Sequence, residues 1–464
     1  MPFLFTLPTT SHISFTFFFS STTHPSLPLT ATSARSLLRT ALKTHKRLPE
    51  PAQASNLPTI ISALTSYIPY LFALEAGLSG IPVAGEEIDI VLLRELDVTW
   101  RMPLSAPPPG RRSPPRTKLR SLEAELAMVL TTLAHAHTLS ARAALRPLLS
   151  TSATDTVSPE GRTQAVASAM NALMTAHSLY TFVLSRITTT PPPPPTPADL
   201  TPEMLSSLAS GALAEATLLT VLRDDPYPAL VAEERREASN DWMFRAPTVP
   251  RVRAHLFARL CLAAGEHAAR ASAAAAGVPG AEGRWGAYCA DLRRTARARA
   301  ARFLGVDAEA EGKGGEGIAW IRGAKAELGL PAEEGLGRLR LGWRERREDK
   351  RVERGGEWGG DAGKLEEGRV LELLERKWVK MNDTIGMQII PPHAPLLATM
   401  PSGREYHTPR AYVPPHLDAG AVARMRAPPD ANEVRGFQGG GDESDSEGEG
   451  YESAQGVSAP GAYY

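Results

Sequence analysis

Residues 377–392 read KWVKMNDTIGMQIIPP, and they end the last strongly periodic segment of the chain. Apolar residues recur through this segment every three or four positions, at Val370, Leu374, Trp378, Met381 and Ile385. This spacing places all five on one side of an α-helix. Pro391 and Pro392 then forbid helix and impose an extended path. We therefore predict a helix that closes a domain, with the chain after it lying flat along the surface.

The composition bounds the class of protein. The chain has 464 residues, 42% of them hydrophobic, with 51 basic and 51 acidic side chains and a net formal charge of zero. This length is enough for one large or two ordinary domains with a substantial core. Balanced charge argues against bulk attraction to nucleic acid or to an acidic membrane, so we expect no nucleic-acid partner.

The two cysteines and the first 30 residues bear on the compartment. Cys261 and Cys289 both lie in alanine-rich helical sequence, which predicts core residues, no disulfide framework and a reducing compartment. The opening 30 residues lack a basic start, and Pro, Ser, Thr and His interrupt every apolar run. We expect short strands there, neither a signal peptide nor a membrane span.

Helical periodicity dominates from residue 56 onward. One helix is expected to begin there, four long ones follow at about 119–137, 158–184, 201–219 and 252–267, and two or three more fill 285–330. Residues 89–101 are ambiguous between a buried strand and a short helix. Helices paired without strand partners predict an α-solenoid-like or bundled domain. No repeat of fixed length is found, which argues against a regular tetratricopeptide array.

Loops and a tail interrupt or follow these helices. We predict loops near 105–117 and 187–198, the second containing a pentaproline, and a mobile Gly, Arg and Glu-rich insertion at 331–365. Residues 393–464 are rich in Pro, Gly and Ser, end in an acidic run, and are predicted to be disordered. Ser444 and Ser446 precede acidic residues, a context that acidophilic kinases favour, and a plain solubilising tail is the alternative.

Enzymatic motifs are absent from the sequence. It has no Gly-rich phosphate loop, no cysteine pairs at zinc spacing, no His-Glu-x-x-His and no Gly-x-Ser-x-Gly. His135 and His137 are two apart and would face different sides of a helix, a poor metal pair. We predict no catalytic residue, no metal and no cofactor. An enzyme with unusual motifs is the rival hypothesis, which a cleft lined by convergent polar residues would favour.

The tetrapeptide YPAL, with Tyr227, Pro228 and Leu230, has the form of a short Tyr-Pro-x-Leu peptide ligand. It directly follows a predicted helix, where its prolines are also explained as turn residues. Burial of Tyr227 in the domain would exclude the ligand hypothesis.

The closing stretch resembles the end of a Bro domain, where a charged helix ends in Asn-Asp-x-Ile and the chain continues through an apolar-Pro pair. The matching residues here are Lys377, Trp378, Asn382, Asp383 and Ile385, followed by Ile390 and Pro391. Segments 62–80, 199–217 and 315–330 resemble successive helices of that family in order. The resemblance implies a mainly α, boomerang-shaped, tetratricopeptide-like helical solenoid with a small N-terminal β element, over residues 1–392.

Within the family, GEEIDIVLLRELDVTWR and MPSGREYHTPRAYVPPHLD resemble fungal members that act in ambient alkaline pH signalling. This implies a cytoplasmic adaptor, recruited through partners to cortical plasma-membrane or endosomal sites. It would bind the polymerising Snf-type ESCRT-III subunit and promote the complex that proteolytically activates a transcription factor. A general endosomal Bro adaptor in multivesicular-body cargo sorting is the alternative.

The resemblance also implies a groove for the C-terminal amphipathic helix of that ESCRT-III subunit. By position it places Leu219 and Val221 near one anchor, with Thr220 standing where some relatives have an aromatic residue. Leu256 and Leu260 match an apolar pair one turn apart on a single helix face. These four residues are predicted to line the groove, and a role in the core is the open alternative.

Overall fold

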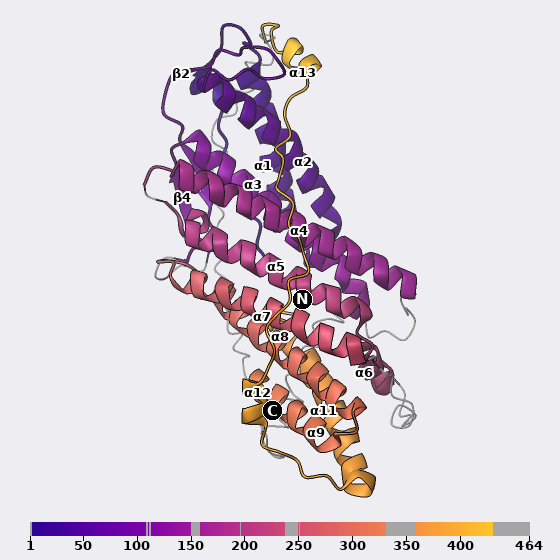
Figure 1. Ribbon diagram of the computed structural model, residues 1–464. Coiled ribbons are helices and arrows are strands. Elements are labelled where there is room, and N and C mark those ends of the chain that lie inside the picture. The colour runs from indigo at the N-terminus through magenta and orange to yellow at the C-terminus, as the bar shows by residue number, and fades with distance from the viewer. Residues whose placement is uncertain are drawn as a thin grey trace, which may run out of the picture.

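The computed structural model describes residues 2–107, 110, 113–149, 158–194, 196–236, 249, 251–330 and 359–429. Its long helices pack in sequence order, each against the next, into an elongated stack (Figure 1). They are α1 (Leu27–Arg47), α2 (Glu50–Leu78), α3 (Leu122–Leu145), α4 (Pro159–Thr189), α5 (Pro202–Asp224), α7 (Arg251–Ala276), α8 (Gly283–Ala310), α9 (Gly314–Leu328) and α11 (Lys364–Met381). The predicted helical solenoid is confirmed.

The shorter elements join or flank these helices. They are the 3-10 turns η1 (Phe15–Phe17), η2 (Arg146–Leu149) and η3 (Ala198–Leu200), the helices α6 (Tyr227–Arg236), α12 (His393–Ala398) and α13 (Ala419–Arg424), and the π-helical turn η5 (Asn382–Gly386). Since α4 continues to Thr189 and a strand begins at Arg116, both predicted loops are shorter than expected. Residues 331–358 lie outside the described part of the chain, as do Ser444 and Ser446.

The β structure consists of two small antiparallel pairs. Strand β1 (Phe19–Ser20) pairs with β2 (Val91–Leu92), and β3 (Val98–Arg101) pairs with β4 (Arg116–Leu119). In β3 the buried residues Val98 and Trp100 alternate with half-buried ones, the period of a strand with one face on the core. The ambiguous segment 89–101 is therefore extended, and only β1 of the β element lies in the opening residues.

Helix starts follow the capping residues that the sequence shows. The Ser121, Ser158 and Thr201 hydroxyls accept the amide N–H three residues on, at 3.1, 3.1 and 3.3 Å. Each cap satisfies one of the amides that a helix leaves unpaired at its first turn. Pro159 and Pro202 occupy the first helical position, where a missing N–H costs nothing.

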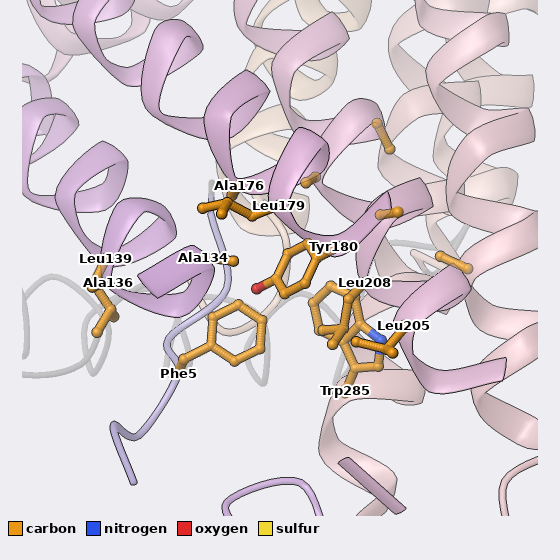
Figure 2. Close-up of a cluster of buried hydrophobic side chains, with 14 of the residues drawn as sticks. Phe5, Ala134, Ala136, Leu139, Ala176, Leu179, Tyr180, Leu205, Leu208 and Trp285 are labelled. Atoms are coloured by element: carbon orange, nitrogen blue, oxygen red, sulfur yellow. The ribbon is translucent and has the colours of Figure 1, made fainter. Parts of the chain in front are cut away.

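The N-terminal segment is part of the core. Figure 2 shows Phe5 directed toward Tyr180 and Trp285, among small residues such as Ala134. The Phe5 ring stacks on His135 at 4.2 Å, and the Trp285 indole N–H donates to the Ser207 hydroxyl at 2.8 Å. An extended segment thus joins α3, α4 and α8 in one apolar cluster.

Two helices in the described part, α2 and α5, are long and apolar enough to span a membrane. The most apolar 18-residue stretch of α5 is 83% buried inside the protein, and that of α2 is 50% buried. Both helices have neighbours in the stack on two sides, so their apolar character is that of core helices.

The prediction of disorder from residue 393 is wrong for residues 393–429. After α12 the chain runs extended along the length of the stack to α13, beside the N-terminal helices (Figure 1). Val422 and Met425 are buried there, and the Ser26 amide donates to the Met425 carbonyl at 3.3 Å. The composition predicted disorder because the tail is rich in Pro, Gly and Ser. Apolar residues of this stretch nevertheless pack against the helices.

Candidate partner-binding face

The four predicted groove residues are mostly inside the protein. Leu219, Val221 and Leu260 are 3%, 0% and 2% exposed, and Leu256 is half-buried. Leu219 packs with α3 and α4 residues such as Leu145, whereas Val221 and Leu260 belong to the main core. The prediction that these three line an open groove is wrong, because a helix between two neighbours buries apolar residues on both sides.

Other residues line the junction between α5 and α7, and all of them except Arg259 are themselves buried in the folded chain. Ala216 and Thr220 lie one turn apart on α5, and Arg259, Ala263 and His267 lie at successive turns of α7. Residues four apart in a helix project to the same side, so each set forms a row. We call these five residues the α5–α7 face. Leu256 lies one turn before the α7 row.

The segment between α12 and α13, residues 399–418, crosses this face, and we call it the C-terminal strap. The Arg404 amide donates to the Arg259 carbonyl at 3.0 Å, and Arg259 Nε donates to the Ser402 carbonyl at 3.1 Å. A Cβ on Gly403 would lie 2.6 Å from the Ala263 backbone nitrogen. The backbone of the strap therefore touches the backbone of α7, which only glycine permits.

Side chains hold the next residues of the strap. Glu405 Oε2 lies 2.9 Å from His267 Nε2, and His407 Nε2 lies 3.3 Å from the Thr220 hydroxyl. Burial lowers the pKa of His407, partly offset by its hydrogen bond to the Ala216 backbone. Thr220 thus places a small polar group where the family resemblance offers an aromatic residue in some members, and the strap covers it.

Further along, aromatic contacts continue the strap toward α13. The Tyr412 ring meets Phe182 of α4 edge-on at 5.3 Å, and burial raises the pKa of Tyr412 to about 12. Arg426, just after α13, pairs with Glu86 at 2.7 Å. The strap is therefore attached at both ends and in the middle.

The domain-closing residues have a structural role. Trp378 and Lys377 are buried, and burial lowers the pKa of Lys377. The Asn382 side chain donates to the Gln388 carbonyl and accepts from the Gln388 amide, both at 3.0 Å. Asn382 thus closes the reversal that follows the helix, while Asp383 is exposed.

The apolar stripe of the closing helix is buried only in part. Val370, Leu374 and Trp378 are buried as predicted, but Met381 and Ile385 are 43% and 81% exposed. The prediction that the helical stripe continues to Ile385 is wrong, because α11 ends at Met381 and Ile385 lies in the π-helical turn η5. Its wider turn moves Ile385 around the axis, away from the stripe.

The short peptide-ligand hypothesis is also wrong. Tyr227 is 4% exposed at the start of α6, with the Arg302 guanidinium 5.2 Å from its ring centre. Its amide donates to Asp225 Oδ1 at 3.1 Å, an interaction typical of a turn. Pro228 and Leu230 are half-buried in the same helix, so no extended peptide is presented.

Buried titratable groups in the described part serve to connect elements. Burial raises the pKa of Glu215 to about 7, although the Tyr288 hydroxyl and the Phe3 amide donate to it at 2.6 and 2.9 Å. Burial raises the pKa of Cys261 to about 12, and both cysteines are buried, as predicted. Over the described residues no group of His, Cys, Asp and Glu could hold a metal ion.

Comparisons with known proteins agree on one family. The chain is 44% identical, over all its length and 98% of the relative, to the pH-response regulator protein palC of Emericella nidulans. It is 35% identical over 133 residues, 28% of its length, to the palC protein of Cryptococcus neoformans, covering 26% of that relative. No family model matches.

A search of solved structures supports the fold. The ALIX BRO1 domain, in its complex with CHMP4C, matches with a TM-score of 0.51 at 14% identity. The match covers 90% of this chain and 96% of that chain. The helical solenoid is therefore the architecture of a Bro1 domain.

Proposed function

Because this chain belongs to the family of the pH-response regulator protein palC, we propose that it is a non-enzymatic adaptor of the fungal ambient alkaline pH signalling pathway. The observation that carries the proposal is identity of 44% over the whole chain to a protein named as a pH-response regulator. A Bro1 fold supports the adaptor role. The relative is named as a regulator, which supports a role without catalysis for this chain.

The proposed partner is the Snf-type polymerising subunit of ESCRT-III. A Bro1 domain of the same fold is known in complex with CHMP4C, which supports this kind of partner. We place the contact on the α5–α7 face and on Leu256 beside it. An amphipathic helix binds by laying its apolar side along such a surface, with a few anchors carrying most of the affinity.

The proposed consequence of binding is assembly of the complex that leads to proteolytic activation of the transcription factor PacC. Other components of pH signalling, such as PalA, are further proposed partners. The proposed location is the cytoplasm, with recruitment through partners to cortical plasma-membrane or endosomal sites. The chain would then need no membrane anchor of its own.

A genetic experiment tests the signalling role. We expect deletion of the gene to abolish growth at alkaline pH and PacC processing while vacuolar cargo sorting stays normal. Reintroduction of the full chain should restore both. Defective cargo sorting with normal PacC processing would instead identify a general endosomal adaptor and overturn the proposal.

A calorimetric titration of the full chain with the C-terminal helix peptide of the Snf-type ESCRT-III subunit tests the partner. Leu256→Asp should weaken binding by at least about tenfold, since a charge replaces the large apolar side chain beside the face. Leu37→Asp is the matched control, because Leu37 is 70% exposed on α1, remote from the face. Absence of binding by the wild-type chain, with the strap variants described below equally inactive, would exclude this partner.

A further inference from the structure

The C-terminal strap lies on the surface that a partner helix would need. It makes backbone hydrogen bonds to Arg259 and side-chain contacts to His267 and Thr220. These residues belong to both α5 and α7, so the strap spans the junction between the two helices. A second segment cannot contact the same atoms while the strap stays in place.

We propose that the C-terminal strap is an autoinhibitory segment that occupies the α5–α7 face and must be displaced before a partner helix binds. This inference rests on the proposed function and adds its regulation. The occupant is a defined part of this chain, residues 402–407, seated on the face through contacts given above.

The contacts between residues 402–407 and the α5–α7 face are weak enough to be reversible. Glu405 is 63% exposed at its side chain although it pairs with buried His267, and Tyr406 is half exposed. A contact with one solvent-exposed partner contributes little to holding the strap in place. The segment 402–407 contributes no residue to the hydrophobic core, whereas Leu417, Val422 and Met425 beyond it are buried in that core.

The architecture allows release of the middle while the ends stay attached. On one side α12 packs on α9, with Leu397 against Gly323, and on the other α13 is buried against the N-terminal helices. A strap released only in its middle remains close to its own face. It therefore competes with a partner at high local concentration, an intramolecular competition whose strength depends on the strap contacts.

Gly403→Ala tests the inference from the strap side and leaves the face unchanged. The added Cβ would lie 2.6 Å from the Ala263 nitrogen and 2.8 Å from its Cα, so residues 402–405 must move away. Gly283→Ala is the matched control, since a Cβ there meets nothing within 4 Å. Both variants are made in the full chain.

The first readout is hydrogen exchange of the Arg404 amide, which donates to the Arg259 carbonyl. We expect its exchange to quicken by at least about tenfold in Gly403→Ala and to stay unchanged in Gly283→Ala. Fast exchange in the wild type would show that the strap does not occupy the face, and would overturn the inference without touching the proposed function.

The second readout is calorimetric binding of the ESCRT-III helix peptide. When only a fraction of the molecules have the strap displaced, the apparent affinity for the peptide equals the intrinsic affinity multiplied by that fraction. Gly403→Ala raises the fraction, so it should bind the peptide roughly tenfold more tightly than wild type. Equal affinities, with exchange faster in the variant, would overturn the inference and keep the partner. No binding to either protein would overturn the proposed partner and the regulatory role together, while exchange still reports the strap contact.

A second variant guards against failure of Gly403→Ala to fold. The double substitution Glu405→Ala, His407→Ala removes the two side-chain contacts of the strap to His267 and Thr220 without adding volume. It should shift exchange and affinity in the same directions, by smaller factors. Unchanged affinity in a folded double variant with faster exchange would also overturn the inference.

Discussion

Arg302 is fully buried and connects three parts of the chain. Its guanidinium lies 2.6 Å from Asp225 at the end of α5 and 2.6 Å from Glu367 of α11. Arg299 shares Glu367 at 2.9 Å. Opposite charges around it raise the pKa of Arg302 despite its burial. The cluster is thus a set of mutually compensated charges, and removing Arg302 takes away the guanidinium that Asp225 pairs with and leaves Glu367 to Arg299 alone.

We predict that Arg302→Leu lowers the free energy of unfolding by about 3–5 kcal/mol, because Asp225 and Glu367 lose their shared partner. Urea unfolding followed by circular dichroism measures the change. Arg294→Leu is the control, since its pair with Asp291 is exposed and should contribute less than about 1 kcal/mol. A similar small change at both sites would show that the buried cluster is not important for stability.

The burial of His135 predicts that the free energy of unfolding depends on pH. Burial lowers its pKa from 6.5 to about 3, and neither ring nitrogen has a hydrogen-bond partner. The unfolded chain binds a proton below pH 6.5 and the folded chain does not until about pH 3, so stability falls as pH falls between these values. The slope from this one group approaches about 1.4 kcal/mol per pH unit.

The measurement compares wild type with His135→Leu at pH 7 and pH 5. The comparison is needed because Glu215, with its pKa raised to about 7, contributes with the opposite sign. We expect the variant to lose less stability on acidification than wild type. Equal losses in both proteins would mean that His135 takes up a proton in the folded state.

At the scale of elements, close contacts between helices depend on individual small residues. A Cβ on Gly211 of α5 would lie 2.6 Å from two ring carbons of Trp285 on α8. At Gly286 of α8 the nearest atom would be the Ala275 Cβ at 3.7 Å, an ordinary contact. The two glycines share a helical setting and differ in the space around them.

We predict that Gly211→Ala destabilises the protein by about 1–3 kcal/mol, since the Trp285 ring must shift in a packed core. Gly286→Ala should instead stabilise it by up to about 1 kcal/mol, because alanine favours helix over glycine. Thermal unfolding of both variants gives the comparison. A stabilised Gly211→Ala would show that α5 and α8 are less closely packed than described.

At the scale of the whole molecule, the two cysteines report on how cooperatively the solenoid opens. Cys261 on α7 and Cys289 on α8 are both fully buried, and burial raises the pKa of each thiol. Thiolate is the reactive form, so native thiols should be inert. We predict that a disulfide reagent labels neither before global unfolding and both after it, as measured across a urea series. Labelling of one thiol below the transition would reveal a separate opening unit.

Much of the architecture could be predicted from local sequence. The helix starts at Ser158 and Thr201 follow from capping residues, and the closing helix from the spacing of Val370, Leu374 and Trp378. These features depend on residues within a few turns of one another. The candidate site was predicted less well, because periodicity gives the apolar side of a helix without showing what covers it.

The sequence by itself therefore determined the helical class, the order of the helices, the capped starts and the family resemblance. Only the tertiary structure decided that Leu219 and Tyr227 are buried, that Ile385 is exposed, and that the strap lies on α5 and α7. The reason is physical. Thr220 and His407 meet across 187 residues of sequence, and exposure is a property of such distant contacts.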